Sequence, residues 1–482
     1  MKLRELLAGV PICAGSADLE MEISGVSYDS RTTRPGDLFA AMTGFATDGH
    51  QYIAKALANG AAAVLCQRRP AEACAYVQTE DSRRALAVIG GNWFGHPAEE
   101  MTMIAVTGTC GKTTTTYLLK AILEQARGVK VGLIGTNQNM IGSDVIPTER
   151  TTPESFEVQK LFREMADAGC THVVMETSSH ALYLDRVYGV RYDVGIFTNL
   201  TQDHLDFHKT MENYCDAKAI LFRNCVTGVV NADDPWTPRL LKDADCKVMT
   251  YAEQADADLR AENIVLSAGG IAFDAVSGAE RVPIRVNIPG GFMVYNTLDV
   301  LGAALALGIS LEESAVVLAK VPHVKGRVEI VPTPGKDYTI LIDYAHTPDS
   351  MVNVLQTVKE FAKGRTVAVF GCGGDRDRTK RPLMGKAAAD WSDFAVVTTD
   401  NPRTEEPEAI IADILPGFDG SATPYHVVVD RIEAIHWAMD HAETDDVIVL
   451  CGKGHETYQE VNHVKHHMDE REIVADYLSS GR

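Results

Sequence analysis

Long apolar runs and positive charge are both in short supply in this sequence. Nowhere do about 18 uncharged apolar residues follow one another, the length that a membrane-spanning helix needs, and the opening MKLRELLAGVPICAG lacks the apolar stretch of a secretory signal. Lysine and arginine number 45 against 66 aspartates and glutamates, which gives a formal net charge of -21. Such a chain repels polyanions, so we expect no nucleic-acid partner. We expect a cytoplasmic protein that is not inserted in a membrane, and we take it to be a monomer.

Cysteine is present but shows none of the spacings that carry chemistry. The ten cysteines are scattered from Cys13 to Cys451, without a CxxC pair or a regular framework. This pattern argues against a zinc cluster and a disulfide scaffold, and it is typical of reduced thiols in the cytosol. We expect most of them to be small core residues. Internal repeats, low-complexity segments and long charge blocks are also absent, so no disordered arm is expected.

What the sequence does have is an alternation of Val- and Ile-rich runs with helical patterns. This alternation is typical of parallel sheets with crossover helices, so we assign the α/β class. A chain of 482 residues is too long for one core, and we predict three domains. They are a small N-terminal α/β domain over residues 1–97, a central P-loop ATPase-like domain with a parallel sheet over 98–325, and a C-terminal Rossmann-like domain over 326–482.

Strand candidates fall into two groups. The central domain opens with MTMIAV and continues with THVVMET and YDVGIFTNL. The C-terminal domain has four runs at helix-length intervals, a spacing that resembles a dinucleotide-fold sheet: TILIDYA, TVAVFGC, FAVVTTD and DVIVLCG. In such sheets, ligands bind beyond the carboxyl ends of the strands, so the residues that follow these runs are the first to inspect.

The stretch VTGTCGKTTTT, residues 106–116, lies between the strand MTMIAV and a helix predicted from the apolar face of KTTTTYLLKAILEQA. In that context Gly108 and Gly111 let backbone N–H groups turn toward a phosphate, Lys112 can reach the outer phosphates, and the Thr113 hydroxyl can bind Mg²⁺. The common phosphate loop has four residues between its first glycine and the Gly-Lys pair, whereas this one has two. The alternative is an ordinary strand-to-helix turn.

Carboxylates and histidines follow two of the predicted central strands. Glu176, in METSSH, would stand at a strand's carboxyl end, and NLTQDHLDFH carries Asp203, His204, Asp206 and His208. Mg²⁺ prefers oxygen ligands and keeps few from the protein, so Glu176 is the natural candidate, and one histidine can join it. Each residue alone is better explained as a hydrogen-bonded structural residue. Their joint occurrence behind a phosphate loop favours a metal-nucleotide site.

The motifs stand in an order that resembles one protein family along nearly the whole chain. After TGTCGKTT come METSSHAL, NLTQDHLDFH, DAKAILF, GGFMVYN, KGRVEIV, DYAHTPDSM, GCGGDRDRTKRPLMG, TTDNPRTEEP and CGKGHE. The series resembles the Mur ligase family, the ATP-dependent amide-bond-forming enzymes of peptidoglycan precursor synthesis. Within that family it is most similar to the subgroup that adds the third residue of the stem peptide. The family usually has Asn where this chain has Cys110.

The resemblance implies a reaction and its reactants. The ATP γ-phosphate is transferred to a carboxylate of UDP-N-acetylmuramoyl-L-alanyl-D-glutamate, and an incoming amine attacks the resulting acyl phosphate. The run DNPR resembles the form associated with meso-diaminopimelate, whose distal carboxylate a guanidinium can meet with two hydrogen bonds. Mg²⁺ is the expected cofactor, and Lys218 in DAKAILF matches a lysine carbamylated by CO₂. From spacing alone, Lys218 would be a solvated helix lysine.

The family's functional positions carry over residue by residue, with the UDP substrate in the first domain, ATP in the second and the amino acid in the third. The expected catalytic residues are Lys112, Glu176, His204 and Lys218. The expected metal ligands are Thr113, Glu176, His204 and Lys218. The residues expected to bind ATP are Gly108, Thr109, Cys110, Gly111, Lys112, Thr113, Thr114, Asn296, Arg327 and Asp343. Those expected to bind the UDP-muramoyl-dipeptide are Tyr28, Ser30, Thr151, Thr152, Ser178 and Arg186. Those expected to bind diaminopimelate are Arg376, Asp400, Asn401, Pro402, Arg403, Gly452 and Glu456.

Several of these residues have a plainer interpretation. Asn296 could be a helix N-cap, and Arg327 could be a surface charge. Arg403 could pair with a nearby acid, Glu405 or Glu406, in a turn made by Asn-Pro. Two positions also depart from the family, because Met293 stands where Asn is common and Leu184 stands where relatives have a polar residue.

Other functions are compatible with a phosphate loop alone. A kinase would share the loop and the metals but would need no amine pocket. A nucleotide-switched binding module would not require Glu176, His204 and Lys218 together. GCGGDR, after the strand TVAVF, lacks the final glycine of GxGxxG and is weak evidence for a dinucleotide site.

Overall fold

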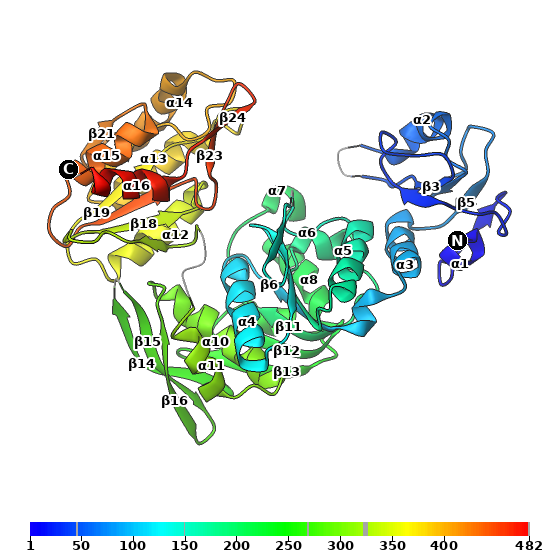
Figure 1. The fold of residues 1–482 in the computed structure, drawn as a ribbon, viewed down its shortest axis with the longest axis horizontal. Coiled ribbons are helices and arrows are strands. Elements are labelled where there is room, and N and C mark those ends of the chain that lie inside the picture. The colour runs from blue at the N-terminus through cyan, green and yellow to red at the C-terminus, as the bar shows by residue number, and fades with distance from the viewer. Residues whose placement is uncertain (45–46, 149, 268, 322–325, 481–482) are drawn as a thin grey trace. The chain divides into compact units, whose positions relative to one another are not determined.

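The computed structural model describes residues 1–44, 47–148, 150–267, 269–321 and 326–480 (Figure 1). The chain separates into two compact units, Met1–Asp258 with Asp299–Ile309 and Leu259–Leu298 with Ser310–Arg482. The boundary predicted at residue 325 falls on residues 322–325, which lie outside the described residues. Sheets rich in parallel strands run through the chain, which confirms the predicted α/β class.

The N-terminal part of the first unit is built on a five-stranded sheet. Its order is β1 (Ala14–Gly15), β5 (Tyr76–Gln78), β4 (Ala63–Cys66), β3 (Asp37–Ala40) and β2 (Gly25–Ser27), parallel except for β1. The helices are α1 (Leu3–Leu6), α2 (Ile53–Ala58) and α3 (Ser82–Phe94), with 3-10 turns at Gly49–Tyr52 and Pro97–Glu100. Helix α3 is capped by Asp81, whose carboxylate accepts from two backbone N–H groups, and it ends at Gly95 in the left-handed conformation.

Six parallel strands form the centre of the first unit. Their order is β13 (Lys247–Ala252), β12 (Cys225–Asn231), β11 (Tyr192–Phe197), β6 (Thr102–Thr107), β10 (His172–Glu176) and β7 (Val131–Ile134). The short strands β8 (Asn139–Ile141) and β9 (Asp144–Ile146) follow β7 in antiparallel pairing. Glu176 is paired with Val106, and Phe197 with Thr107, so the carboxyl ends of β10, β6 and β11 meet at one edge. The predicted strands MTMIAV, THVVMET and YDVGIFTNL are therefore confirmed.

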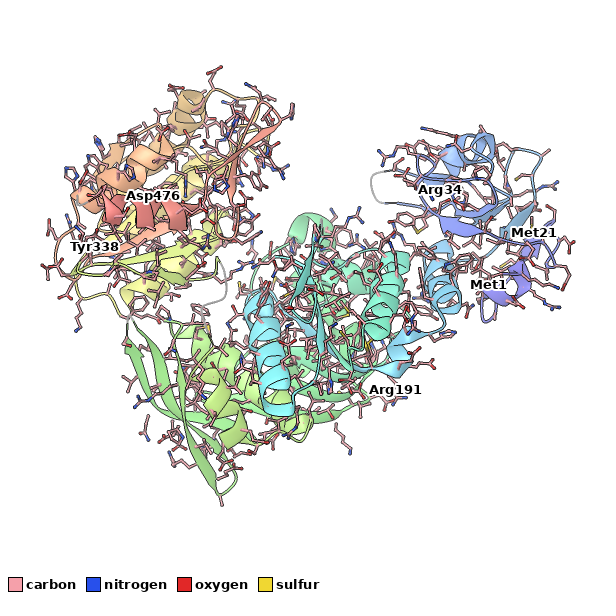
Figure 2. All side chains as sticks on the ribbon, in the orientation of Figure 1. Met1, Met21, Arg34, Arg191, Tyr338 and Asp476 are labelled. Atoms are coloured by element: carbon pink, nitrogen blue, oxygen red, sulfur yellow. The ribbon has the colours of Figure 1, made fainter. Side chains whose placement is uncertain are left out.

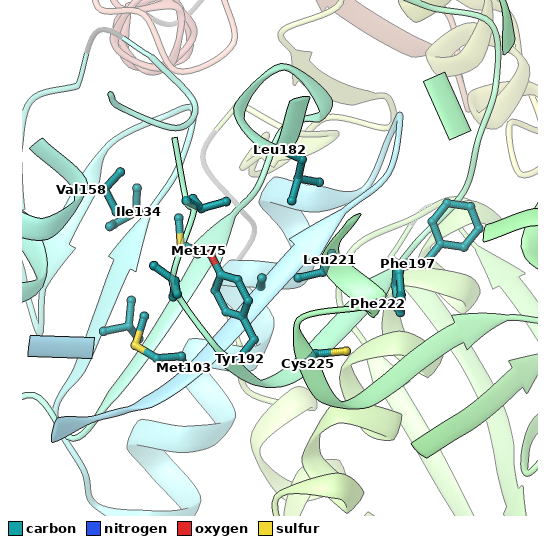
Figure 3. Close-up of a cluster of buried hydrophobic side chains, with 14 of the residues drawn as sticks. Met103, Ile134, Val158, Met175, Leu182, Tyr192, Phe197, Leu221, Phe222 and Cys225 are labelled. Atoms are coloured by element: carbon teal, nitrogen blue, oxygen red, sulfur yellow. Dashed lines mark hydrogen bonds between the residues drawn. The ribbon is translucent and has the colours of Figure 1, made fainter. Parts of the chain in front are cut away.

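Helices cover this sheet, and several of them pack on an apolar core. The helices are α4 (Lys112–Arg127), α5 (Ser155–Asp167), α6 (Ser179–Tyr183), α7 (Leu205–His208), α8 (Met211–Phe222) and α9 (Thr237–Leu240). The core includes Met103, Val158, Met175 and Leu221, and Tyr192 lies among them with its hydroxyl on the Met175 sulfur at 3.4 Å (Figure 3). Burial of these side chains fixes the sheet edge on which the candidate site is built.

A buried carboxyl group connects helix α4 to helix α10 (Phe292–Ala306). Asp299 is fully buried, and the Thr115 hydroxyl lies 3.1 and 3.0 Å from its two oxygens. Burial raises the pKa of Asp299 well above its usual value, and the hydrogen bond from Thr115 opposes this shift. The protonated form therefore favours the fold. The stabilisation of the fold that comes from protonating Asp299 is complete below the unfolded-state pKa of about 3.9. It is lost as pH rises through the folded-state pKa.

We expect Asp299→Asn to raise the melting temperature, by an amount that grows between about pH 5 and pH 8. The amide cannot ionise, yet its oxygen can still accept from Thr115, so the variant escapes the cost of a buried charge. Thermal unfolding across this pH range tests the prediction, with Asp243→Asn at an exposed position as the control. A gain that stays constant or shrinks with pH would contradict it.

The second unit begins with an antiparallel meander that was not predicted. It consists of β14 (Leu259–Ser267), β15 (Gly270–Ser277) and β16 (Glu280–Val286). Helix α11 (Leu311–Leu318) is capped by the Ser310 hydroxyl, which accepts from the Glu313 N–H at 3.2 Å.

The rest of the second unit is a six-stranded sheet with helices on it. Its order is β17 (Glu329–Val331), β18 (Thr339–Asp343), β22 (Val447–Cys451), β19 (Thr366–Phe370), β20 (Phe394–Val397) and β21 (Tyr425–Val427), parallel except for β17. The helices are α12 (Pro348–Lys359), α13 (Lys380–Trp391), α14 (Pro407–Ile414), α15 (Arg431–Asp440) and α16 (Glu470–Ser479), with a 3-10 turn at Leu415–Phe418. A hairpin of β23 (Tyr458–Val461) and β24 (Val464–His467) completes it. The four predicted strand runs are confirmed as β18, β19, β20 and β22.

Figure 2 shows the side chains on the ribbon, and the strands in the middle of the sheets are the most deeply buried. Every residue of β19 and β22 is buried, which explains why their sequences are continuous apolar runs. None of the ten cysteines is in a disulfide in the structure, and six of them are buried, as expected for core residues. Of the helices in the described part of the chain, none has the length and apolar content of a membrane span.

Candidate active site

The loop after β6 is held in place by the two residues that follow β11. Thr198 Oγ1 and Asn199 Nδ2 donate to the Cys110 carbonyl at 2.6 and 3.2 Å, and the Cys110 N–H donates to Asn199 Oδ1 at 2.9 Å. A Cβ at Gly108 would lie 1.9 Å from Thr198 Oγ1, so only glycine fits this close approach. Helix α4 begins at Lys112, and its N-terminal N–H groups are available to an anion. The predicted context of strand, glycine loop and helix is confirmed.

Two lysine side chains converge on one carbonyl of this loop. Lys112 Nζ donates to the carbonyls of Gly108 and Thr109 at 3.0 and 2.9 Å, and Lys218 Nζ, from helix α8, donates to the Gly108 carbonyl at 2.8 Å. Lys218 is 1% exposed and lies 4.5 Å above the Tyr214 ring. Burial, and then the charge of Lys112, lower the pKa of Lys218 well below its usual value. Lys218 is thus a buried amine next to the loop, and not the solvated lysine that spacing alone suggested.

The oxygen ligands expected for Mg²⁺ lie at the same sheet edge. Glu176 ends β10, is fully buried and accepts from the Thr136 N–H and hydroxyl at 3.0 and 2.8 Å. Thr113 is buried in the first turn of α4. These hard oxygens suit Mg²⁺. Among the described residues, no group of three or more His, Cys, Asp and Glu side chains is arranged to hold a metal.

Histidines gather beside this edge in an aromatic cluster. The His204 ring lies 4.8 Å from that of His180, and its side chain is 47% exposed. His208, in contrast, is buried, with Nε2 at 2.9 Å from the Ser179 hydroxyl and its ring stacked on Tyr214. Of the two histidines in NLTQDHLDFH, His208 has the contacts of a structural residue. The side chain of Asp206 lies outside the described residues.

The residues expected to bind the muramoyl-dipeptide are brought together next to Glu176. Thr152 Oγ1 donates to the Glu176 carbonyl at 2.9 Å and accepts from the Ser178 N–H at 3.2 Å. Arg186 Nη1 donates to the Thr152 carbonyl at 3.0 Å. Thr151 Oγ1 lies 3.0 Å from the hydroxyl of Thr136, which also binds Glu176. One hydrogen-bonded network therefore connects these four residues to the predicted metal ligand.

Two further arginines in this region were not identified from the sequence. Glu154, in RTTPES, lies 2.9 Å from Arg150 Nη1, 3.0 Å from Arg186 Nε and 3.5 Å from Arg83 Nη1. Three guanidinium groups thus share one carboxylate, which leaves an excess of positive charge that suits an anionic ligand. Arg83 was missed because it is 71 residues from Glu154 in the chain.

The two predicted uridine contacts lie in the N-terminal part of the first unit. Ser30 is buried, and its carbonyl accepts from Asn59 Nδ2 at 2.7 Å. Tyr28 is half-buried against helix α5, and burial together with the nearby Glu157 carboxylate raises the pKa of its hydroxyl.

The predicted adenine and ribose contacts lie in the second unit. Asn296 is buried in the second turn of α10, with Nδ2 at 3.8 Å from the Met293 sulfur, so the N-cap interpretation is wrong. Asp343 ends β18 and accepts from the N–H groups of Val328 and Ala345 at 2.9 and 2.8 Å. Burial raises the pKa of Asp343, and the nearby guanidinium of Arg327 opposes this shift.

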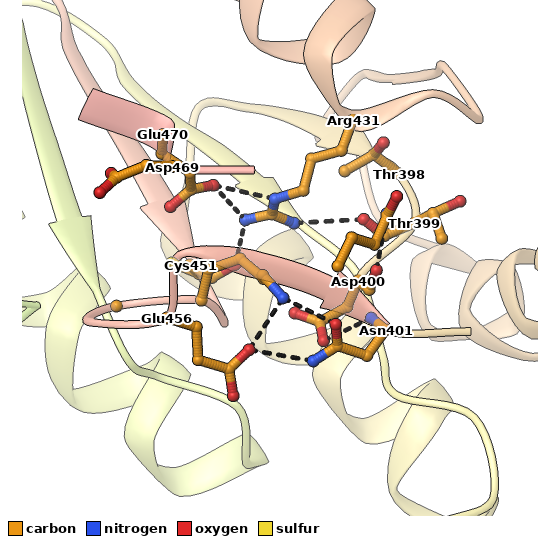
Figure 4. Close-up of polar contacts among 12 residues, drawn as sticks. Thr398, Thr399, Asp400, Asn401, Arg431, Cys451, Glu456, Asp469 and Glu470 are labelled. Carbon is orange, nitrogen blue, oxygen red and sulfur yellow. Dashed lines mark hydrogen bonds and ion pairs between the residues drawn. The ribbon is translucent and has the colours of Figure 1, made fainter. Parts of the chain in front are cut away.

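Hydrogen-bonded polar side chains surround the predicted DNPR loop after β20 (Figure 4). Asn401 Nδ2 donates to Glu456 Oε2 at 3.0 Å, and the buried Lys453 donates to both residues, at 2.7 Å to Asn401 Oδ1 and 2.8 Å to Glu456 Oε2. Asp400 Oδ2 is buried without a hydrogen-bond partner among the described residues, and a Cβ at Gly452 would lie 2.5 Å from it. Lys453 was not singled out from the sequence, although it stands between Gly452 and Glu456.

Arg403 has a different partner from the one that its neighbours in sequence suggested. Its Nε lies 3.1 Å from Glu460 Oε2 on β23, whereas Glu405 binds the buried guanidinium of Arg381 at 2.8 Å. Pairing of Arg403 with Glu405 or Glu406 is therefore wrong. A Cβ at Gly373 would lie 2.9 Å from Arg403 Nη1 and 3.7 Å from Arg376 Cγ, so both predicted arginines flank this glycine.

Known proteins are similar to this chain in sequence and in structure. The UDP-N-acetylmuramoyl-L-alanyl-D-glutamate--2,6-diaminopimelate ligase of Clostridium botulinum is 48% identical over 463 residues, 95% of each chain. The ligase 1 of that name from Clostridium acetobutylicum is 47% identical over 481 residues, 99% of each chain. A solved structure of a ligase with the same name superimposes with a TM-score of 0.73 at 32% identity, covering 100% of this chain and 99% of the other. MurF of Thermotoga maritima in complex with ADP, at 19% identity and a TM-score of 0.62 over 94% and 97% of the chains, shares the fold.

Family matches cover the three sheet regions. The Mur ligase family catalytic domain matches residues 22–92, the Mur ligase middle domain matches residues 106–304, and the glutamate ligase domain of Mur ligases matches residues 326–454. The phosphate loop, Glu176 and Lys218 fall in the second match, and the DNPR loop falls in the third. The chain belongs to the Mur ligase family.

Proposed function

We propose that this protein is an ATP-dependent amide ligase that joins meso-diaminopimelate to UDP-N-acetylmuramoyl-L-alanyl-D-glutamate through an acyl-phosphate intermediate. The observation that carries the choice of amino acid is the DNPR loop, in which Asp400 Oδ2 is buried without a hydrogen-bond partner among the described residues and Arg403 stands three residues later. A carboxylate and a guanidinium on one loop complement a ligand that carries both an ammonium and a carboxylate. The names of the relatives agree with this assignment.

Phosphoryl transfer is assigned to the loop after β6. The N-terminal N–H groups of α4 bind the polyphosphate, and Lys112 leaves the carbonyls of Gly108 and Thr109 to contact the outer phosphates. Asn296, Arg327 and Asp343 bind the nucleoside. Thr109, Cys110, Gly111 and Thr114 complete the phosphate site.

Mg²⁺ would be held by Thr113, Glu176, His204 and a carbamate on Lys218. When bound, it screens the negative charge of the substrate carboxylate and the polyphosphate as they approach. Carbamylation forms a bond between the neutral Lys218 Nζ and the carbon of CO₂ and releases one proton. Together with the proton that the ammonium form gives up first, two protons leave as the cation becomes an anion. Support comes from the burial of Lys218 next to the loop, where an ammonium would repel both Lys112 and a metal ion.

The acceptor substrate is assigned to the hydrogen-bonded network next to Glu176. Arg186 meets a carboxylate of the dipeptide, and Thr151, Thr152 and Ser178 orient it toward the phosphate loop. The surplus positive charge around Glu154 favours this anionic substrate. Tyr28 and Ser30 are assigned to the uridine end.

Sustained release of ADP and phosphate distinguishes the candidate functions. A ligase turns over only when UDP-N-acetylmuramoyl-L-alanyl-D-glutamate and an amino acid are both present. A kinase needs only the first of these, and a nucleotide-switched binding module needs neither. Formation of the UDP-muramoyl-tripeptide, detected by mass, confirms the ligase.

We expect kcat/KM for meso-diaminopimelate to exceed that for L-lysine, and Arg403→Ala to reduce this preference. Lysine lacks the distal carboxylate and would leave the half-buried Arg403 without its anion, a loss of about 1.5–3 kcal/mol, or about 10- to 200-fold. The control is Arg281→Ala, which removes an exposed guanidinium on β16 that pairs with Asp274 and Glu262. Equal kcat/KM values for the two amino acids in the unmodified enzyme would falsify the assignment of substrate.

A further inference from the structure

Strand β23 fixes the backbone of Arg403 on both sides. The Arg403 N–H donates to the Glu460 carbonyl at 3.0 Å, and the Asn462 N–H donates to the Arg403 carbonyl at 2.8 Å. Arg403 has a φ of 52°, in the left-handed region that a residue with a side chain seldom occupies. The two backbone hydrogen bonds hold it there, so the direction in which its side chain leaves the loop is determined by the hairpin.

The Arg403 guanidinium also makes two hydrogen bonds within the protein. Nε lies 3.1 Å from Glu460 Oε2, and Nη1 donates to the Gly374 carbonyl at 2.8 Å. A guanidinium has five N–H donors. Within the described residues these two contacts use Nε and one hydrogen of Nη1, so the outer end, with Nη2 and the second Nη1 hydrogen, is left to a ligand. That end is the one with which a guanidinium can bind both oxygens of a carboxylate.

The hairpin of β23 and β24 is also hydrogen-bonded to the first two residues of the DNPR loop. Gln459 Nε2 donates to the Asp400 carbonyl at 2.8 Å, and the Glu460 N–H donates to Asn401 Oδ1 at 2.8 Å. Asn401 Oδ1 also accepts from Lys453. Two consecutive residues of β23, Gln459 and Glu460, therefore contact three residues of the DNPR segment: Asp400, Asn401 and Arg403. The position of Glu460 relative to the DNPR loop is thus set by two hydrogen bonds of its backbone, one from its N–H to Asn401 and one from the Arg403 N–H to its carbonyl.

We propose that Glu460 is a positioning residue for amino-acid specificity, which orients the Arg403 guanidinium so that its outer end faces the distal carboxylate of the substrate. This inference rests on the proposed function. Glu460 also cancels the net charge of Arg403, so recognition at this point depends on the direction of hydrogen bonds more than on attraction at a distance. A free guanidinium would have to lose rotamer freedom on binding, and Glu460 removes that cost in advance.

The opposite role for Glu460 is that of a competitor, an internal carboxylate that occupies the place of the substrate's carboxylate. The two roles predict opposite changes in KM for meso-diaminopimelate and in the preference for it over L-lysine. If Glu460 orients Arg403, Glu460→Ala raises KM for meso-diaminopimelate and lowers the ratio of kcat/KM for meso-diaminopimelate to that for L-lysine by about tenfold. If Glu460 competes, the same variant lowers KM and raises the ratio.

The test compares Glu460→Ala, Glu460→Gln and Val464→Ala in the full-length enzyme. The Gln carbonyl can still accept from Arg403 Nε, so Glu460→Gln is expected to restore most of the ratio, while KM for ATP stays the same in all variants. Val464 is exposed on the partner strand of the hairpin and controls for damage to it. An unchanged or raised ratio in Glu460→Ala, a Gln variant as impaired as Ala, or an equal loss in Val464→Ala overturns the proposal. Absence of a diaminopimelate preference in the unmodified enzyme would instead reject the proposed function.

Discussion

Lys112→Ala is expected to lower turnover by about 10²- to 10³-fold or more, with little change in the melting temperature. A cationic donor aimed at a transferring phosphoryl group is worth this much because its charge is most effective where negative charge develops. We expect the fold not to depend on it, since within the described residues Lys112 Nζ donates to carbonyls of its own loop, those of Gly108 and Thr109. ADP release at saturating substrates measures the effect.

The control for this variant is Lys130→Ala, which removes an exposed lysine that donates to the Ala168 carbonyl in the same unit. It should retain turnover. Near-normal turnover of a folded Lys112→Ala protein would refute the assignment of this loop as the phosphate cradle.

Lys218→Ala is expected to be nearly inactive, by about 10³-fold, and to regain part of its activity when a short carboxylic acid is added. Alanine cannot form a carbamate, and it opens a space in helix α8 next to the Gly108 carbonyl that a small carboxylate can fill. Turnover measured against the concentration of formate or acetate tests this. The same acids should not rescue Lys112→Ala, because that variant lacks a cation and not an anion. Full activity of Lys218→Ala, or equal rescue of both variants, would rule out the carbamate.

The parts of the fold that could be predicted are those in which local sequence and tertiary structure agree. The strands β6, β10, β19 and β22 are buried on both faces, so they are continuous apolar runs, and the phosphate loop follows one of them directly. The antiparallel meander of β14, β15 and β16 was not predicted because its strands are not continuous apolar runs. In β14 the exposed and buried positions alternate, and charged residues on the outer face break the apolar signal.

The residues of the candidate site also differ in whether the sequence could predict them. Glu176 and Asp400 could be found because each lies at the carboxyl end of a strand, the last residue of β10 and three residues beyond β20, where α/β sheets bind ligands. The partner of Arg403 could not, because Glu460 is 57 residues away and reaches it only through the hairpin β23–β24. Lys218 illustrates a third case: its helix position was evident, but its burial depends on the packing of α8 against the sheet.

The three guanidinium groups around Glu154, those of Arg83, Arg150 and Arg186, also affect how an acidic enzyme binds an acidic substrate. A net charge of -21 opposes the approach of a nucleotide sugar from far away. At physiological ionic strength the Debye length is about 8 Å, so most of that distant repulsion is screened, whereas partly buried charges at close range are screened much less. Dissolved salt therefore weakens the general repulsion more than the local attraction of Arg83, Arg150 and Arg186, and capture depends mainly on the last few ångströms of the encounter.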